Sequence, residues 1–559
     1  MSLLSLKIRP LSLFASTNPN SLPKFQSSKF ERKVASSSHA NTTKRPSPNN
    51  VYQSDSEKYL HELYIKKAKN ILIANLDDPF KSLAMIDTIQ GLGIDLHFLH
   101  EIDQILRIIY KEFYQNKGYY GRDLREVSLC FRLLRQEGHN VQESIFRNIL
   151  DKKSGFRDDI QNDVDGLIEL YEASELGVEG EEILDSLREF TFARLTELCS
   201  GRENHQEQEI MSSLAQPRHK TLSRLTSKRF ISMIKIMGEE NNDWLQSLLR
   251  VAEIDSMMLK SLLQEEISQT FKWWRDLGLE KELRKARNQP LKWHTWSMGI
   301  LQDPTFSEQR LDLTKLISLI YIIDDIFDVY GELEELTIFT QVVERWDHHS
   351  LEKLPRYMKV CFEALDTITM EISMKICKLH GWNPTLSLQK SWARLCKAYL
   401  VEAKWFNSGY LPNTEEYMKI GAVSSGVHLV MLHVYYLLGE ITAEKVKLIE
   451  SNPKIVSSAA TILRLWDDLD VNQDGFDGSY VDCYLNEHKG STVAEARAHV
   501  FQEISKAWKH LNKECLNPRP FSRAFSKACL NIARTVPLMY KYDDEQQLRG
   551  LNKYLKHLT

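Results

Sequence analysis

Apolar residues recur along most of the chain with the spacing of an amphipathic α-helix. In the segment 263–274, Leu263, Ile267 and Phe271 follow one another at four-residue intervals, and Trp274 continues the stripe. Residues at such intervals share one helix face, and charged residues occupy the positions between them. The same period runs through "VSLCFRLLRQEG", "EEILDSLREFTFARLTEL" and "VHLVMLHVYYLLGE", whereas strand-like alternation does not exceed chance. The pattern predicts an all-α protein from about residue 55 onward.

Polar segments divide this helical pattern into two parts. The stretches "CSGRENHQEQE" (199–209) and "QPRHKTLSRLTSKR" (216–229) are the best candidates for a joint between domains. We therefore predict two helical domains, residues 51–226 and residues 227–559. The composition agrees, because 23 Gly and 16 Pro in 559 residues are too few for a fold built from many short strands.

The first 50 residues differ in composition from everything after them. They are rich in serine, lysine and arginine, and Glu31 is their only acidic residue. This composition, without a long apolar centre, is typical of an organelle transit peptide, and the serine content favours a plastid. The alternative is a disordered tail, in which case the protein would be cytosolic.

The overall charge excludes some classes of partner. The 72 Lys and Arg nearly balance the 76 Asp and Glu, which gives a formal charge of −4. Nucleic-acid-binding domains are usually distinctly basic, so we expect no nucleic-acid partner. The apolar run 316–323 is far shorter than the ~18 residues needed to span a bilayer, so we expect no membrane span.

The eight cysteines lack metal-binding spacing and are expected to be buried thiols. We expect a monomer.

The strongest chemical signal is the segment "LISLIYIIDDIFDVYGELEE" (316–335), in which an apolar helix ends in three acidic residues. Asp324 and Asp328 are four residues apart and point the same way, with Asp325 about 100° round the helix. Neighbouring carboxylates repel one another, so a positive group is needed to keep them ionised. Carboxylate oxygens suit Mg²⁺ or Mn²⁺, and Mg²⁺ commonly shares its coordination shell with a substrate phosphate. The alternative is a solvated acidic helix end.

A second acidic group, "ILRLWDDLDVNQDG", also follows an apolar segment. Arg464 precedes Asp467 by three residues, so the two side chains can share a helix face. Such a pair suits a site that holds an anion through a metal and directly through a guanidinium, although an ordinary helix ion pair is the alternative. If the two acidic groups face each other across a cavity, they would clamp a diphosphate through metal ions.

Two further segments add candidates for the walls of that cavity. "RNQPLKWHTW" supplies Arg287 as a second group for phosphate and Trp296 as an aromatic face for a carbocation. In "GAVSSGVHLV", Ser424 lies among Gly and Ser residues that commonly kink a helix. Core packing and a plain loop are the respective alternatives.

At this point a resemblance to plant class I terpene synthases becomes clear. It rests on "FRLLRQEGHNV", "WWRDLGL", "IDDIFDVYG", "EAKWFNSGYLPNTEEYM", "LRLWDDL" and "ARTVPLMYKYDDEQ". The resemblance implies a non-catalytic N-terminal helical domain and a C-terminal class I terpenoid-synthase helical bundle with up to three Mg²⁺ or Mn²⁺ ions. It implies the following site: Asp324, Asp325 and Asp328 as catalytic acids; Asp324, Asp328 and Asp467 as metal ligands; Arg287 and Arg464, with these ligands, as the diphosphate site; and Trp296, Ser424 and Tyr540 in the pocket wall.

The chain departs from the family pattern in ways that bear on its product and its activity. The tandem arginine with a tryptophan eight residues on is missing, and Arg287-Asn288-Gln289 replaces the paired R-x-R. Both features resemble the clade that makes acyclic alcohols such as linalool and nerolidol. In the second metal motif, Val471 and Gly475 stand where the family has a Ser or Thr and a Glu, and Asp470 or Asp474 could substitute.

These observations predict a metal-dependent lyase that ionises geranyl diphosphate and forms linalool. Farnesyl diphosphate and nerolidol become equally favoured if the leader is not used. Two alternatives stay open. The chain could be a catalytically impaired relative, because its second metal motif is incomplete, or it could be a chain-elongating prenyltransferase.

Overall fold

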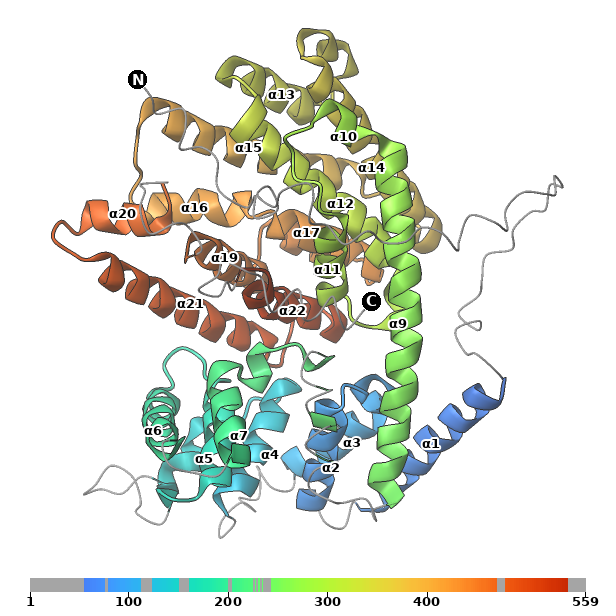
Figure 1. Cartoon of the computed structure of the whole chain (residues 1–559), viewed down its shortest axis with the longest axis vertical. Helices are drawn as coiled ribbons and strands as arrows, with labels where there is room; N and C mark the ends of the chain where they lie inside the picture. Colours follow the sequence, from blue (N-terminus) through green and yellow to red (C-terminus); the bar gives the residue numbers. More distant parts are fainter. Residues whose placement is uncertain are drawn as a thin grey trace, which may run out of the picture.

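The computed structural model describes residues 55–75, 79–111, 123–149, 160–199, 204–224 with a few positions up to 234, 243–469 and 478–540. These residues form helices connected by turns, arranged as two bodies joined by one long helix (Figure 1). The predicted all-α class is confirmed. The predicted leader, residues 1–50, lies outside the described residues.

The N-terminal body is the smaller of the two and has its own apolar core. Side chains such as Leu72, Ile86 and Phe131, each 0% exposed, belong to this core. Its helices are α1 (Asp55–Ala74), α2 (Pro79–Gly91), α3 (Leu99–Ile109), α4 (Leu124–Gln136), α5 (Val164–Ser174), α6 (Glu182–Cys199) and α7 (Asn204–Ala215).

The C-terminal body is a larger bundle built round a second apolar core, which includes Trp293, Trp392 and Phe327. Six of the eight cysteines are buried as expected, whereas Cys377 is exposed and Cys515 is partly exposed. The helices of this body are α10 (Leu279–Glu282), α11 (Pro290–Ile300), α12 (Ser307–Asp325), α13 (Leu333–Arg345), α14 (Arg356–His380), α15 (Thr385–Ser408), α16 (Thr414–Ser424), α17 (Val427–Leu438), α18 (Ala443–Glu450), α19 (Lys454–Leu469), α20 (Tyr480–Glu487), α21 (Val493–Cys515) and α22 (Arg523–Tyr540).

Helix α9 (Asp243–Leu277) runs along one side of the molecule and belongs to both bodies (Figure 1). Its first part contributes Leu245 and Leu248 to the N-terminal core, and Trp274 near its end belongs to the C-terminal core. The stripe predicted from the sequence is correct at Leu263 and Trp274 but wrong at Phe271, which is 45% exposed.

The reason is a buried ion pair on that face of α9. Glu266 is 1% exposed, and its carboxylate accepts hydrogen bonds from Arg310 and from His294 at 2.6 and 2.9 Å. Glu266 therefore takes a core position that a hydropathy pattern assigns to solvent. As a result, the buried face of α9 points away from Phe271.

The predicted joint 216–229 is described continuously over residues 216–224, which pass between the bodies. His219 and Asn512 of α21 are hydrogen-bonded through Nε2 and Oδ1 at 2.7 Å, and Arg534 of α22 donates from Nε to the His219 carbonyl at 2.7 Å. The other predicted joint is largely helical, because α7 begins at Asn204. The predicted boundary at residues 226 and 227 stays a prediction, since residues 225 and 226 lie outside the described part of the chain.

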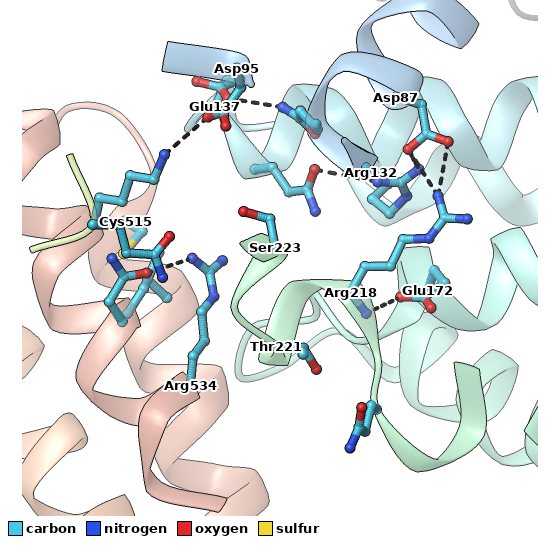
Figure 2. Close-up of a pocket in the computed structure, with 18 of the residues that line it drawn as sticks. Asp87, Asp95, Arg132, Glu137, Glu172, Arg218, Thr221, Ser223, Cys515 and Arg534 are labelled. Carbon is cyan, nitrogen blue, oxygen red and sulfur yellow. Dashed lines mark hydrogen bonds and ion pairs between the residues drawn. The ribbon is translucent and has the colours of Figure 1, made fainter. Parts of the chain in front are cut away.

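A cavity of about 200 Å³ lies between the two bodies and is lined mainly by charged and uncharged polar residues (Figure 2). Arg218 contacts Asp87 through both carboxylate oxygens at 2.9 Å, and Arg132 donates to Asp87 at 2.7 Å. Glu172 is 0% exposed, and its carboxylate accepts the Arg218 backbone N–H at 2.7 Å. Burial raises the pKa of Glu172 from 4.5 to about 7, against the opposing effect of Arg218 and Arg132.

The raised pKa of Glu172 predicts a pH-dependent effect on stability. The folded protein keeps the Glu172 proton up to about pH 7, whereas the unfolded chain releases it near pH 4.5. The stabilisation is therefore full below about pH 4.5 and is lost as the pH rises through 7. We expect Glu172→Gln to gain up to about 3 kcal/mol in unfolding free energy over the wild type at pH 8, and little at pH 5. Denaturant unfolding at pH 5 and at pH 8 measures the unfolding free energies. As a control, Glu182→Gln, at an exposed position, should differ from the wild type in unfolding free energy by the same amount at pH 5 as at pH 8.

The predicted interruption of the helix near Ser424 is present. Helix α16 ends at Ser424, and α17 begins after Gly426, whose φ is +75°. This conformation favours glycine, and a Cβ at Gly426 would also lie 3.1 Å from a side-chain carbon of Ile320.

Within the described residues, Thr414–Leu438 is the one stretch with the length and apolarity of a membrane span, but 78% of its most apolar window is buried inside the protein. Here it forms part of the bundle core.

Candidate active site

A cavity of about 580 Å³ opens in the C-terminal body, within the ~300–1,000 Å³ usual for small-molecule sites. Its wall is built from α11, α12, the turn 326–330, α15, the end of α16, α17, α19 and α22, together with the segment that precedes α11. Every site residue predicted from the sequence lies in this wall. They are Arg287, Trp296, Asp324, Asp325, Asp328, Ser424, Arg464, Asp467 and Tyr540.

The first acidic cluster lies at the carboxyl end of α12. This helix ends at Asp325, and the chain continues through the π-helical turn η8 (Ile326–Tyr330), which carries Asp328. The apolar stripe of α12 is buried in the core, so the acids that follow it are placed at the edge of the cavity. π-Turns within helices are frequent at functional sites, and this one keeps Asp328 in the same wall as Asp324.

Arg287 holds this cluster together. Its Nη2 donates to Asp324 Oδ2 at 2.5 Å, its Nε lies 2.8 Å from Asp325 Oδ1, and its backbone N–H donates to Asp325 Oδ2 at 2.7 Å. Burial raises the pKa of Asp325 to about 6, and Arg287 partly opposes that rise. Both acids line the cavity, but the Asp325 side chain is 8% exposed and accepts two contacts from Arg287, whereas that of Asp324 is 26% exposed. Asp325 is thus the main structural partner of Arg287.

The second cluster lies on α19 and contains a residue that the sequence analysis missed. Arg464 is 5% exposed, and its Nη2 lies 3.2 Å from Asp468 Oδ1 but 3.6 Å from Asp467 Oδ2. Asp468 also accepts hydrogen bonds from the Tyr417 hydroxyl at 2.8 Å and the Tyr480 backbone at 3.2 Å. Asp468 therefore positions Arg464, and Asp467 faces the cavity. The i, i+4 spacing of Arg464 and Asp468 was the signal that could have identified this pair.

The charged groups surrounding Arg464 keep it protonated. Burial alone lowers its pKa, but Tyr417, Asp468 and Asp467 together raise it well above its ordinary value. Gly421 of α16 packs against the arginine stem, and a Cβ at that position would lie 3.1 Å from Arg464 Cδ. A larger residue at position 421 would require the Arg464 stem to shift by a few tenths of an ångström.

Aromatic side chains cover the wall between the two clusters. Trp296 donates from Nε1 to the Tyr321 hydroxyl at 3.0 Å, and its ring centroid lies 6.2 Å from that of Tyr540. Tyr321 lines the same cavity as Asp324 and Asp467. Burial raises the pKa of Tyr540 well above its usual range, and the same holds for Tyr399 across the cavity. Both hydroxyls therefore stay protonated at neutral pH.

Ser424 lies in the wall at the break between α16 and α17. Its hydroxyl donates to Glu402 Oε1 at 2.6 Å and is 3.3 Å from the Gly421 carbonyl of its own helix. The side chain is 4% exposed, so these contacts fix the direction of the helix end.

The residues that make the second metal motif unusual are not among those described. Val471, Gly475, Asp470 and Asp474 all fall within 470–477. The described residues nevertheless offer a donor set that fits a hard divalent cation, because Asp324, Asp328 and Asp467 bring carboxylate oxygens to one cavity. Arg287 and Arg464 stand beside those carboxylates and can contact a bound anion.

Known proteins resemble this chain in both sequence and structure. The terpene synthase N-terminal domain matches residues 30–216, and the metal binding domain of the terpene synthase family matches residues 275–510. A chloroplastic S-(+)-linalool synthase of Arabidopsis thaliana is 70% identical over 574 aligned residues, covering 100% of both chains. An (E)-nerolidol synthase of Cannabis sativa is 46% identical and covers 86% of this chain and 89% of its own.

Solved structures also resemble this chain. The crystal structure of isoprene synthase from grey poplar (Populus x canescens), in complex with three Mg²⁺ ions and dimethylallyl-S-thiolodiphosphate, matches with a TM-score of 0.81. The two chains are 31% identical, and the match covers 90% of this chain and 98% of that one.

The chain belongs to the terpene synthase family. It is a lyase that acts on prenyl diphosphates, and the predicted dependence on Mg²⁺ or Mn²⁺ agrees with the family's metal binding domain. The matches give no support to the prenyltransferase alternative. The plastid localisation predicted from the leader is confirmed by the chloroplastic relative that matches along the whole chain.

Proposed function

We propose that the protein converts geranyl diphosphate into linalool inside plastids. The observation that carries this proposal is one cavity that brings together two acidic clusters, two arginines and an aromatic wall. The 70% identity to a linalool synthase along the entire chain supports geranyl diphosphate as substrate and linalool as product. Both acidic clusters come from a single chain, which supports a monomer.

The polar part of the cavity binds the diphosphate. Arg287 and Arg464 supply guanidinium donors that can contact its oxygens directly. Asp324, Asp328 and Asp467 would hold the metal ions, which when bound neutralise the diphosphate and help it to leave. Asp325 and Asp468 do not need to reach the ligand, because they fix the two arginines.

The apolar part of the cavity shields the allylic cation once the C–O bond has broken. Ile317, Ile320 and Val430 line it and exclude bulk water, while the faces of Trp296 and Tyr540 attract positive charge. A water molecule that adds at the tertiary carbon and loses a proton gives linalool. We assign no side chain as the base, since the released diphosphate itself can accept the proton.

The direct test is an assay of the purified chain, at full length and from residue 51, with geranyl or farnesyl diphosphate and Mg²⁺. Chiral gas chromatography should detect linalool from geranyl diphosphate, and the 70% identical relative leads us to expect the S-(+) enantiomer. A kcat/KM higher for farnesyl diphosphate, with nerolidol as product, would replace the proposal by the sesquiterpene alternative, for which the 46% identical nerolidol synthase is the precedent.

A second candidate is an enzyme of impaired activity, and it is favoured by Val471 and Gly475. Neither residue can supply a metal ligand from its side chain. If no volatile product forms from either substrate, replacing these positions by Ser and Glu should restore turnover. Robust turnover of the unaltered chain would instead mean that other ligands suffice and would eliminate this candidate.

A further inference from the structure

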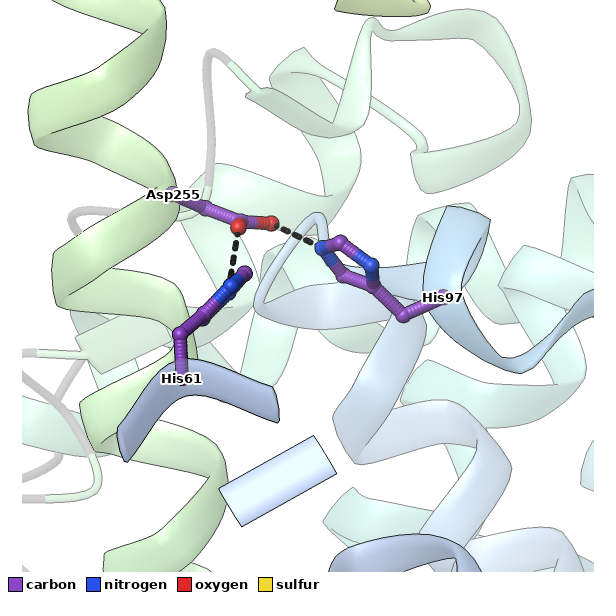
Figure 3. A group of neighbouring side chains, drawn as sticks. All are labelled: His61, His97 and Asp255. Carbon is purple, nitrogen blue, oxygen red and sulfur yellow. Dashed lines mark hydrogen bonds and ion pairs between the residues drawn. The ribbon is translucent and has the colours of Figure 1, made fainter. Parts of the chain in front are cut away.

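A group of two histidines and one aspartate lies in the N-terminal body (Figure 3), and none of the three lines the cavity that carries the acidic clusters. His61 comes from α1, His97 from the 3₁₀-helix η2 (Asp95–Phe98) and Asp255 from α9. His61 Nε2 lies 2.9 Å from Asp255 Oδ1, and His97 Nε2 lies 2.7 Å from Asp255 Oδ2. One potential ligand atom from each residue lies within 4.8 Å of the other two.

The group is closed on one side and accessible on the other. The His61 side chain is 3% exposed, whereas those of Asp255 and His97 are 20% and 30% exposed. An ion could therefore reach the group past His97 without any movement of the core.

We propose that His61, His97 and Asp255 bind one Zn²⁺ ion, with a water molecule as the fourth ligand on the exposed side. Imidazole nitrogens favour zinc over Mg²⁺, which prefers a shell made only of oxygen. Ligand atoms at ~2.0–2.2 Å from a tetrahedral zinc lie ~3.3 Å apart. The Nε2–carboxylate distances of 2.7 and 2.9 Å need to open by only about half an ångström to reach that geometry.

The position of the group gives the ion a structural role. Its three ligands come from three separate elements, so a bound ion would tie α1 to α9 and to the turn before α3. Helix α1 leaves Tyr59, Leu60 and Leu63 exposed by 66%, 43% and 44%, so apolar packing holds it only in part. His61 follows the predicted leader, so the site persists in a chain cleaved near residue 50.

The alternative is that the group binds no metal ion and is held only by hydrogen bonds, which both imidazoles donate to Asp255. His97→Gln distinguishes the two, because the glutamine amide can still donate to a carboxylate but is a poor zinc ligand. The matched control is His100→Gln, a substitution of an exposed histidine in the next helix, α3 (Leu99–Ile109).

The experiment is equilibrium dialysis of the full-length chain against Zn²⁺, with excess Mg²⁺ to occupy the acidic clusters, followed by metal analysis. We expect one zinc per chain for the wild type and for His100→Gln, and at least a tenfold weaker affinity for His97→Gln. Cobalt(II) in place of zinc should give the visible absorption of a tetrahedral nitrogen–oxygen site in the wild type and in His100→Gln but not in His97→Gln. Zinc should raise the Tm of the wild type without changing that of His97→Gln.

Two results would overturn the proposal. One is a wild type that binds no zinc under these conditions, and the other is a His97→Gln variant that binds zinc as tightly as the wild type. Circular dichroism without metal checks that His97→Gln is folded. Because the readouts are metal content and Tm, they do not depend on whether the chain makes linalool.

Discussion

Asp324→Asn should reduce turnover of geranyl diphosphate by at least about 10³-fold, because it removes a charged ligand from the first acidic cluster. The amide keeps the size of the side chain and can still accept the hydrogen bond that Arg287 Nη2 donates at 2.5 Å. We therefore expect the helical signal and Tm to change little. Product formation at saturating Mg²⁺ measures the effect, and a higher Mg²⁺ requirement should accompany any residual activity.

A matched control for this experiment is Asp276→Asn, at an exposed position near the end of α9. It removes one carboxylate from the same body without touching the cavity, so turnover should stay within about twofold of wild type. If Asp324→Asn also stayed within that range, the first acidic cluster could not be the metal site.

Arg464→Lys should lower kcat/KM for geranyl diphosphate by about 10²-fold, although the positive charge is kept. The arginine donates from Nε to the Tyr417 hydroxyl at 3.0 Å and to Asp468 at 3.2 Å, so two buried partners fix the orientation of its guanidinium group. A lysine cannot make both bonds and also face the cavity. Inhibition by inorganic diphosphate should weaken in parallel, since the lost contact is to the diphosphate.

Asp468→Asn separates positioning from direct contact. It should also weaken diphosphate inhibition, although Asp468 is absent from the cavity wall, because Arg464 loses its ion-pair partner. Arg345→Lys, at an exposed position in the last turn of α13, is the control and should leave both quantities unchanged. Unaltered diphosphate inhibition in Arg464→Lys would remove this arginine from the diphosphate site.

The sequence predicted the helical class and the main members of the cavity wall, because both follow from short-range patterns. Helical period appears directly in the spacing of apolar residues, and the acids at 324, 325 and 328 stand out against the apolar segment that precedes them. Arg287 was predicted as a group for the diphosphate, but its contacts with Asp324 and Asp325 were not, since 37 positions separate it from Asp324.

Apart from Asp468, which lies only four residues from Arg464, the failures of prediction share a physical cause, which is pairing between groups far apart in the sequence. Glu266 occupies a core position only because Arg310 and His294 neutralise it there, and this displaces Phe271 to the surface. Similarly, the contact between His61 and Asp255 joins residues that no local pattern relates. Hydropathy treats such residues one at a time and therefore assigns them to solvent.

Helix α9 has 35 residues, which corresponds to a rod of about 52 Å. Its first turns bury Leu245, Leu248 and Val251 against the N-terminal helices, even though its last turns carry Trp274 into the catalytic bundle. A truncated chain containing only the catalytic half would thus expose this apolar surface of α9 to water. Among the residues that the structure describes, the N-terminal helices supply none to the wall of the cavity that carries the acidic clusters. They instead cover this apolar part of α9, so a catalytic half on its own would need polar residues at those positions to stay in solution.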